Sequence, residues 1–349
     1  MSPGRSATQK EQQAMKVVVT GGTGFIGANV VRLLLKRGDE VTCLVRSSSP
    51  GLCLEGLPVT LNNTKLTDAE GLRRVLHGAD EVYHLAGVFD PSPQGADLMA
   101  EVHVKATAAL GEAALAAGVP RLVVCSSSIT VGFGDRENPG DEDTPIHELD
   151  AVYGKTGPLR AYHDTKAEAE ALAVHLAGRG LGAVIVNPDY IIGPWDIKPT
   201  SGALIVTMAK GWLPVYPRGG KCFQSAEDCA LGHLLAAKHG KAGRRYLLGA
   251  HNLSYREFMG VVAEVLGVRP PILPMPRRAG ELLGLVGAVG SRYDAHRFAG
   301  LDRYVLRAMA QPRYRSGRRA EEELGVPVSP IRDAVEAAVG WFRGQGMIP

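Results

Sequence analysis

The sequence predicts an α/β protein, with a doubly wound parallel sheet followed by a smaller, irregular C-terminal cap. Short β-branched runs alternate with helical patterns along the first half of the chain, as they do in proteins built on a parallel sheet. A glycine-rich turn joins the first strand to the first helix. After Asn187 the alternation weakens and prolines recur, so a less regular part is expected there.

The predicted elements of the first half alternate between strand and helix. A strand at 16–19, a helix at 27–37 and a strand at 41–45 form a βαβ unit, which implies parallel strands. Beyond this unit we expect strands at 81–85, 121–125 and 182–186, and helices at 98–117 and 165–177. In the second half we expect helices at 226–238, 255–266 and 330–343, and a strand at 245–248.

The glycine run at 20–27 predicts a dinucleotide-binding turn. Gly21 permits the tight turn, Gly24 lets the backbone approach a pyrophosphate, and Gly27 lets the helix pack against the strand. The phosphates would then lie at the N-terminus of the helix, where backbone N–H groups attract anions. The cofactor-binding residues assigned to this run are Gly21, Thr23, Gly24, Phe25, Ile26 and Gly27.

These patterns divide the chain into three parts. Residues 1–14 are polar and are predicted to be a disordered extension. Residues 15–190, with returning segments from the second half, are predicted to form a Rossmann dinucleotide-binding domain. Residues 191–349 are assigned mostly to a substrate-binding cap, since irregular segments on a rigid scaffold commonly carry specificity.

Arg46, at the end of the second predicted strand, bears on which dinucleotide is bound. An acidic residue there would bond the 2′-hydroxyl of NAD, whereas an arginine followed by three serines at 47–49 suits the 2′-phosphate of NADP. A surface arginine at a strand end would give the same pattern. The sequence therefore favours NADP(H) and leaves NAD(H) open.

Tyr162 and Lys166 are the candidate catalytic pair. Four residues apart on a helix, they share one face. A free phenol has a pKa of about 10 and a neighbouring ammonium lowers it, so the pair can pass a proton to or from a substrate oxygen. Upstream, the strand at 121–125 ends in three serines at 126–128, where a hydroxyl above the cofactor crevice can bond a carbonyl.

Composition narrows the remaining possibilities. The net charge of +3 does not indicate a nucleic-acid partner, and the late arginines, among them Arg313, Arg315, Arg318 and Arg319, predict a solvated C-terminal face or, less favoured, an anion-binding rim. The five scattered cysteines are predicted to be reduced core thiols, with no metal site. Without a signal peptide or a run long enough to span a membrane, a cytoplasmic protein is expected.

In these motifs the chain resembles the extended short-chain dehydrogenases/reductases, the NAD-dependent epimerase/dehydratase family. The matching runs are the glycine turn at 20–27, His84-Leu-Ala-Gly87, the serines at 126–128, Tyr162-x-x-x-Lys166, and Asn187-Pro188 with Gly193-Pro194. The runs at 193–200 and 228–235 are most similar to the dihydroflavonol-reductase-like branch, including hopanoid-associated sugar-epimerase-like proteins. The resemblance covers residues 16 to about 343.

The resemblance implies a role for each matching residue. Tyr162 would be the general acid in carbonyl reduction and would lie, with Lys166, against the cofactor. Lys166 would lower the pKa of Tyr162 and bond the nicotinamide ribose, and Ser128 would polarise the carbonyl. The further cofactor contacts that it implies are Leu66, Leu85, Ala86, Gly87 and Pro188.

Three features depart from the family's pattern. Lys65 stands where members usually have an aspartate on the adenine amine, which puts that contact in question. His103 replaces a common asparagine, and a structural role is expected for it. The acidic segment at 134–161, directly before Tyr162, is either a disordered surface loop or a substrate lid.

Two enzymatic functions remain open. The first is an NAD(P)H-dependent reductase of a ketone or aldehyde on a bulky, hydrophobic or aromatic small molecule. Packing of the cap would equally explain the apolar residues that indicate such a substrate, which are Tyr190, Trp195, Met208, Trp212, Tyr216, Leu282, Leu283, Leu285 and Val286. The second is a nucleotide-sugar epimerase with bound NAD, although Lys221 replaces the arginine that such enzymes often use for the diphosphate.

Other readings are less favoured. A dehydratase would need Thr-Asp-Glu where this chain has Ser-Ile-Thr at 128–130, and a non-catalytic dinucleotide sensor would not need an intact serine, tyrosine and lysine. The alanine-rich helices at 98–117 and 165–177 fit the homodimer interface common in the family. Packing against the sheet would produce the same composition.

Overall fold

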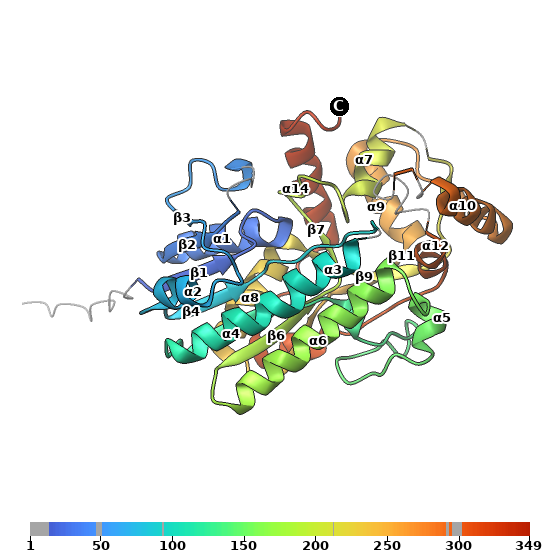
Figure 1. Ribbon diagram of the computed structural model, residues 1–349. Coiled ribbons are helices and arrows are strands. Elements are labelled where there is room, and N and C mark those ends of the chain that lie inside the picture. Colours follow the sequence, from blue (N-terminus) through green and yellow to red (C-terminus); the bar gives the residue numbers. More distant parts are fainter. Residues whose placement is uncertain (1–13, 47–50, 93, 212, 291–292, 295–301) are drawn as a thin grey trace, which may run out of the picture.

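Seven parallel strands form the central sheet of the computed structural model, which describes residues 14–46, 51–92, 94–211, 213–290, 293–294 and 302–349 (Figure 1). Their spatial order is β10 (Arg245–Leu248), β6 (Ala183–Pro188), β5 (Arg121–Cys125), β4 (Glu81–His84), β1 (Lys16–Thr20), β2 (Glu40–Leu44) and β3 (Thr60–Asn62). The strand order reverses between β1 and β4, where a doubly wound sheet opens a crevice at the carboxyl ends of its strands. The predicted Rossmann sheet is confirmed.

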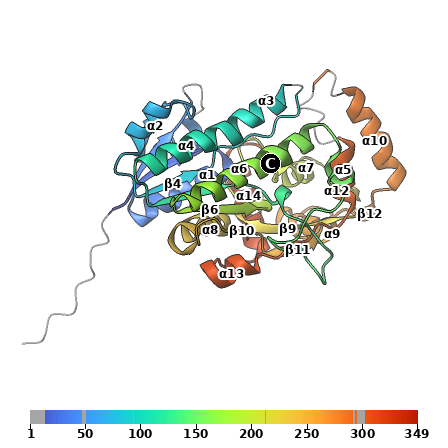
Figure 2. The same ribbon diagram turned by 60° about the horizontal axis from the view of Figure 1, so that its bottom comes forward.

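Helices cover both faces of this sheet (Figure 2). One face carries α2 (Ala69–Leu76), α4 (Ala106–Ala116) and α6 (Pro158–Gly178), and the other carries α1 (Phe25–Arg37), α8 (Ala226–His239) and α13 (Arg318–Leu324). Strand β1 shows why its run is apolar throughout: Val17 and Val19 pack toward α1, while Val18 packs toward α2 and α4. Burial on both sides favours such continuous β-branched runs.

The helix predicted at 98–117 is composed of three segments. These are α3 (Gly95–Met99), a π-helical stretch η2 (Ala100–Lys105) and α4. Gly118 follows α4 with φ +69°, in the left-handed region, and ends the helix. A Cβ on Gly111 would lie 2.2 Å from Cδ1 of Leu176, so the small residues of α4 already serve close packing against α6 within the chain. The homodimer stays a prediction.

Helix α6 begins earlier than its predicted start at residue 165. Its first residue is Pro158, which suits the first turn because the missing N–H needs no partner there. Tyr162 and Lys166 therefore lie inside one continuous helix. The apolar pattern alone did not reveal the polar first two turns.

The second half adds a smaller layer beside the sheet (Figure 1). Its strands are β7 (Tyr190–Ile192), β9 (Gly220–Ser225) and β11 (His251–Ser254) in one sheet, and β8 (Val215–Tyr216) and β12 (Leu273–Pro274) in another. Its helices are α7 (Ala203–Lys210), α9 (Tyr255–Leu266), α10 (Arg277–Gly290), α12 (Arg303–Ala310) and α14 (Ile331–Gly344). Because β10 and α8 belong to the large sheet and its cover, part of the second half returns to the first. The boundary at residue 190 stays a prediction, and the extension predicted at 1–14 lies outside the described residues except for its last residue.

The segment at 134–161 is ordered, so the prediction of a disordered loop is wrong. Gly134 and Gly140 form β-bridges with Tyr314 and Arg315, and α5 (Leu149–Tyr153) follows. Two short 3-10 turns, η1 (Gly51–Cys53) and η3 (Ser128–Thr130), complete the described elements. All five cysteines are buried and unpaired, as predicted. No helix in the described ranges is both long and apolar enough to cross a membrane.

Candidate active site

The glycine turn has the shape that a dinucleotide pyrophosphate requires. Gly21 has φ +71°, and a Cβ there would lie 2.5 Å from the carbonyl carbon of Leu85; a Cβ on Gly27 would lie 2.1 Å from the oxygen of Gly21. Gly24 precedes α1 and supplies no side-chain cap, and the first turn of α1 holds no acidic residue. The first N–H groups of α1 are thus left for an anionic ligand, so these residues fit the phosphates of NAD(P).

A buried hydrogen-bond chain fixes the adjoining edge of the sheet. Thr20 Oγ1 accepts from the Ala86 N–H (3.2 Å) and lies 2.8 Å from His84 Nδ1, while His84 Nε2 lies 3.0 Å from Thr107 Oγ1. Burial, with the positive charge of Lys166, lowers the pKa of His84 to about 3, so its ring is neutral. This series of hydrogen bonds holds Leu85 and Ala86 beside the glycine turn.

Lys166 lies buried at the end of β5. Its Nζ donates to the carbonyl oxygen of Cys125 at the end of β5 (3.0 Å), and the residue is 5% exposed. A Cβ on Gly87 would be 3.2 Å from this Nζ, so a larger residue at position 87 would crowd the ammonium. The structure therefore brings Lys166 and Gly87 together, and their roles toward a cofactor stay predictions.

His103 holds the loop after β4 against α6. Its Nε2 accepts from the Val88 N–H (3.1 Å), and its Nδ1 lies 2.9 Å from Thr165 Oγ1, which donates to the Ala161 carbonyl. Burial and the nearby Lys166 lower the pKa of His103 to about 3. These contacts fit the structural role expected for His103.

Tyr162 lies one turn before Lys166, among aromatic rings. Its ring centroid is 5.6 Å from that of Phe89 and 5.5 Å from that of His103, both in edge-on geometry. Ser128 opens η3 directly after β5 and is 6% exposed. Because β5 and β6 are parallel, with Cys125 opposite Val186, Ser128 and the end of β6 share one edge of the sheet.

The remaining predicted cofactor residues lie around the same edge. Pro188 is the last residue of β6. Arg46 is exposed two residues beyond β2, which pairs with β1 beside the glycine turn. Leu66 is half-buried against the core under α2, whereas Lys65 is exposed. The serines at 47–49 lie outside the described residues.

No sequence motif predicted the buried cluster around Glu170, which lies one turn beyond Lys166. Oε1 of Glu170 accepts from Ser126 Oγ, from Thr130 Oγ1 (2.6 Å) and from Asn187 Nδ2 (2.6 Å). Its Oε2 lies 3.2 Å from Arg245 Nη1. We call these five residues the Glu170 cluster. It ties α6, β6 and β10 to the turn that carries Ser128.

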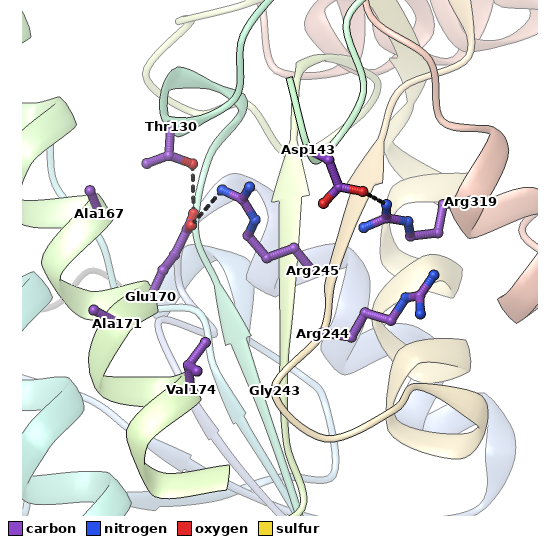
Figure 3. A pocket seen from close by; sticks show the side chains of 10 residues that line it. All are labelled: Thr130, Asp143, Ala167, Glu170, Ala171, Val174, Gly243, Arg244, Arg245 and Arg319. Atoms are coloured by element: carbon purple, nitrogen blue, oxygen red, sulfur yellow. Dashed lines mark hydrogen bonds and ion pairs between the residues drawn. The ribbon is translucent and has the colours of Figure 1, made fainter. Parts of the chain in front are cut away.

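A cavity of about 510 Å³ opens beside this cluster (Figure 3). None of the predicted catalytic residues lines it, and its three arginines are already paired: Arg244 with Glu323, Arg245 with Glu170, and Arg319 with Asp143. The cavity is therefore separate from the predicted catalytic residues.

A second cluster that the sequence did not reveal surrounds Asp189, the residue after Pro188. Arg315 Nη1 lies 2.7 Å and Lys221 Nζ 3.9 Å from its carboxylate oxygens. Arg313 is close to them, and both arginines are buried, at 4% and 2% exposed. We call these four residues the Asp189 cluster. The solvated face predicted for the late arginines is thus wrong for Arg313 and Arg315, because both guanidinium groups lie over the Phe133 ring in the interior and Arg315 pairs there with Asp189. It is correct for Arg318, whose side chain is 78% exposed.

Several of the apolar side chains expected near a substrate serve packing instead. Tyr190 packs on Phe223 at 4.9 Å, Trp195 lies between Arg32 and Trp341, and Met208 is buried. On α10, by contrast, Leu282, Leu285 and Val286 are exposed. Trp212 lies outside the described residues.

The fold and this site define a dinucleotide-binding α/β protein with a tyrosine–lysine pair at the crevice. The family model of the NAD dependent epimerase/dehydratase family matches residues 17–249. The chain therefore belongs to that family, and it is an NAD(P)-dependent enzyme of the short-chain dehydrogenase/reductase type.

Individual relatives align along nearly the whole chain. A putative dihydroflavonol 4-reductase of Synechocystis sp. is 33% identical over 341 residues, covering 95% of each chain. Sterol demethylase protein B of Methylococcus capsulatus is 31% identical, covering 96% of this chain and all of the relative. The crystal structure of a nucleoside-diphosphate-sugar epimerase from Pseudomonas aeruginosa is similar with a TM-score of 0.76 and 28% identity, covering 96% of this chain and 99% of that one.

Proposed function

We propose that this enzyme is an NADPH-dependent reductase that acts on a ketone or aldehyde of a bulky small molecule, with Tyr162 as the proton donor. The observation that carries the proposal is the placement of Tyr162 and Lys166 on one face of α6, beside Gly87 and at the sheet edge that Ser128 shares. A reductase needs a proton donor, a positive charge on the same helix face as that donor, and a carbonyl-binding hydroxyl. These three residues supply them in that order.

Each residue has a defined task in this proposal. Bound NADPH would supply the hydride that reaches the carbonyl carbon. Ser128 donates a hydrogen bond to the substrate oxygen, and Tyr162 gives that oxygen its proton. The Lys166 ammonium, held in place by the Cys125 carbonyl, favours the phenolate that remains.

The surroundings of Tyr162 support an apolar substrate. Phe89 packs edge-on against Tyr162 and is 40% exposed, so an aromatic surface is available beside the proton donor. Two relatives at 33% and 31% identity carry names that refer to a flavonoid reductase and to sterol demethylation, which are bulky apolar substrate classes.

The preference for NADPH rests on Arg46. It is exposed beyond β2, next to the glycine turn, where a 2′-phosphate would lie. Arg46→Asp should lower kcat/KM for NADPH by at least about tenfold, since a charge-assisted hydrogen bond contributes about 1.5–3 kcal/mol. It should leave NADH less affected. Equal losses with both cofactors would contradict the preference.

Replacement of Tyr162 tests the reductase proposal most directly. Tyr162→Phe should lower the rate of NADPH oxidation with ketones by about 10²- to 10⁴-fold, the usual contribution of a positioned acid. Tyr293→Phe, at a tyrosine that is 88% exposed, is the matched control and should keep full activity. Undiminished turnover by Tyr162→Phe would show that another group donates the proton.

A nucleotide-sugar epimerase is the second candidate. The structural similarity to a nucleoside-diphosphate-sugar epimerase favours it, whereas Lys221 stands in place of the arginine that such enzymes often use for the diphosphate. An epimerase would interconvert UDP-sugars with catalytic NAD and no net NADPH oxidation. Assays with UDP-glucose and UDP-galactose, beside aryl and alkyl ketones, separate the two functions.

A further inference from the structure

The Asp189 cluster contains more positive charge than its one carboxylate balances. Arg315 and Lys221 both face Asp189, and Arg313 lies beside them. Within the described ranges, Asp189 is the only carboxylate that forms an ion pair with any of these three cations. Burying a charge without a counter-charge costs free energy, so such an excess needs an explanation.

Arg313 and Arg315 differ in how their N–H groups are used. The Arg315 guanidinium donates to the carbonyls of Val131 and Gly132 and to Asp189. The Arg313 guanidinium makes no hydrogen bond to any described residue, and its Nε is buried without an acceptor. Arg313 therefore keeps donors free in a buried place.

Two aromatic rings explain where the Arg313 guanidinium lies, but they do not provide hydrogen-bond acceptors for its N–H groups. Its guanidinium carbon lies 4.7 Å from the ring centroid of Phe133 and 5.6 Å from that of Tyr153. Ring faces attract the positive charge, but they leave the in-plane N–H groups unused. Burial accordingly lowers the pKa of Arg313.

Arg313 lies close to the proposed reaction centre. The hydroxyl of Tyr153 donates to the carbonyl of Ile129, which follows Ser128, and the Tyr153 ring lies 5.4 Å from that of His163, which follows Tyr162. Asp189 itself follows Pro188. The cluster therefore lies next to the residues that directly follow Ser128, Tyr162 and Pro188, which are three of the predicted site residues. It lies on the side of the cap.

We propose that the substrate carries a carboxylate, which binds the free edge of Arg313 with Lys221 beside it, while its carbonyl reacts at Tyr162. The substrate class is an oxo acid whose carbonyl and carboxylate are separated by an apolar body, and this inference rests on the proposed reductase function. A guanidinium that lies over aromatic rings offers its edge, which matches a planar carboxylate. The side chain of Lys221 is 21% exposed, so an anion has access to the cluster.

The test compares matched acids and esters. Substrates are ω-benzoylalkanoates with about two to five methylene groups and their methyl esters, assayed with NADPH; binding of the same acids to the Tyr162→Phe enzyme with NADPH is measured by calorimetry. We expect at least one acid to exceed its ester by about 10- to 100-fold in kcat/KM, the range for a charge-assisted hydrogen bond. Arg313→Met should remove this preference by raising KM for the acid, and Arg313→Lys should retain part of it.

Controls separate the carboxylate site from the reductase function. Arg318→Met removes an exposed arginine and should leave the acid-to-ester ratio unchanged. Lys221→Met should reduce the ratio, and it serves as the second variant if Arg313→Met does not fold. Acids that bind without being reduced would refute the reductase but support the carboxylate site.

The opposite results would overturn the inference. Ketone reduction with equal use of acids and esters at every length, or a preference that persists in Arg313→Met, would refute the carboxylate site and leave the reductase intact. Failure of every acid to bind would refute it as well. Binding of UDP or inorganic phosphate, but of no carboxylate, would assign the cluster to a phosphorylated ligand instead.

Discussion

The two buried polar clusters of this enzyme differ in how their charges are compensated. In the Glu170 cluster, one carboxylate meets one arginine and three neutral donors, so its charge is compensated within the protein. In the Asp189 cluster, one carboxylate meets three cations, and the side chains of two of them, Arg313 and Lys221, have no hydrogen-bonded partner among the described residues. Both clusters adjoin the same edge of the sheet, one beneath α6 and one toward the cap.

This difference separates buried charges that stabilise the fold from buried charges that serve a function. A balanced cluster lowers the free energy of the folded chain and holds its elements in register, which here means α6, β6 and β10. An unbalanced cluster raises that free energy, and proteins keep such groups where function requires them. The two clusters should therefore respond differently to mutation.

The largest expected effect is loss of the Glu170 carboxylate. Glu170→Ala leaves Arg245, Ser126, Thr130 and Asn187 without their shared acceptor, and removing one partner of a buried ion pair costs about 3–5 kcal/mol. Urea unfolding would measure this loss. Glu168→Ala, at an exposed glutamate on the same helix, is the control and should stay within about 0.5 kcal/mol of the wild type. A small loss at position 170 would mean that the cluster does not stabilise the fold.

The second prediction contrasts two neighbouring arginines. Arg315→Met leaves Asp189 and two carbonyls short of donors, so it should lower the free energy of unfolding by about 3 kcal/mol. Arg313→Met removes an unpaired charge and keeps most of the apolar volume. Its cost should be below about 1 kcal/mol, because the charge that it removes is uncompensated. Equal losses at both positions in urea unfolding would show that Arg313 is a structural residue.

The sequence predicted the cofactor half well because local patterns determine it. Position 27 requires glycine because of its contact with Gly21, and position 21 requires glycine because of its contact with Leu85, directly after the neighbouring strand β4. Tyr162 and Lys166 are related by helical spacing alone. The parallel sheet follows from alternating strand and helix patterns, since each crossover is built from adjacent segments.

The two clusters could not be predicted, because their members meet only through the tertiary fold. Arg315 lies 126 residues from Asp189, and Arg245 lies 75 residues from Glu170. No local pattern marked Arg313 and Arg315 as buried, because Tyr314 between them is buried too and the many neighbouring arginines resemble a solvated surface.

In the cofactor half, burial and the Lys166 charge keep two neighbouring histidines neutral, and this makes stability depend on pH. Folding lowers the pKa of His84 and His103 from 6.5 to about 3, so between these values the unfolded chain binds protons that the folded chain does not. Stability is therefore full above pH 6.5 and falls as the pH decreases toward 3, by up to about 2 kcal/mol per histidine at pH 5. His103→Asn should reduce this slope in urea unfolding at pH 7 and pH 5, whereas His147→Asn, at an exposed histidine, should not. An unchanged slope in His103→Asn would mean that His103 can accept a proton beside Lys166.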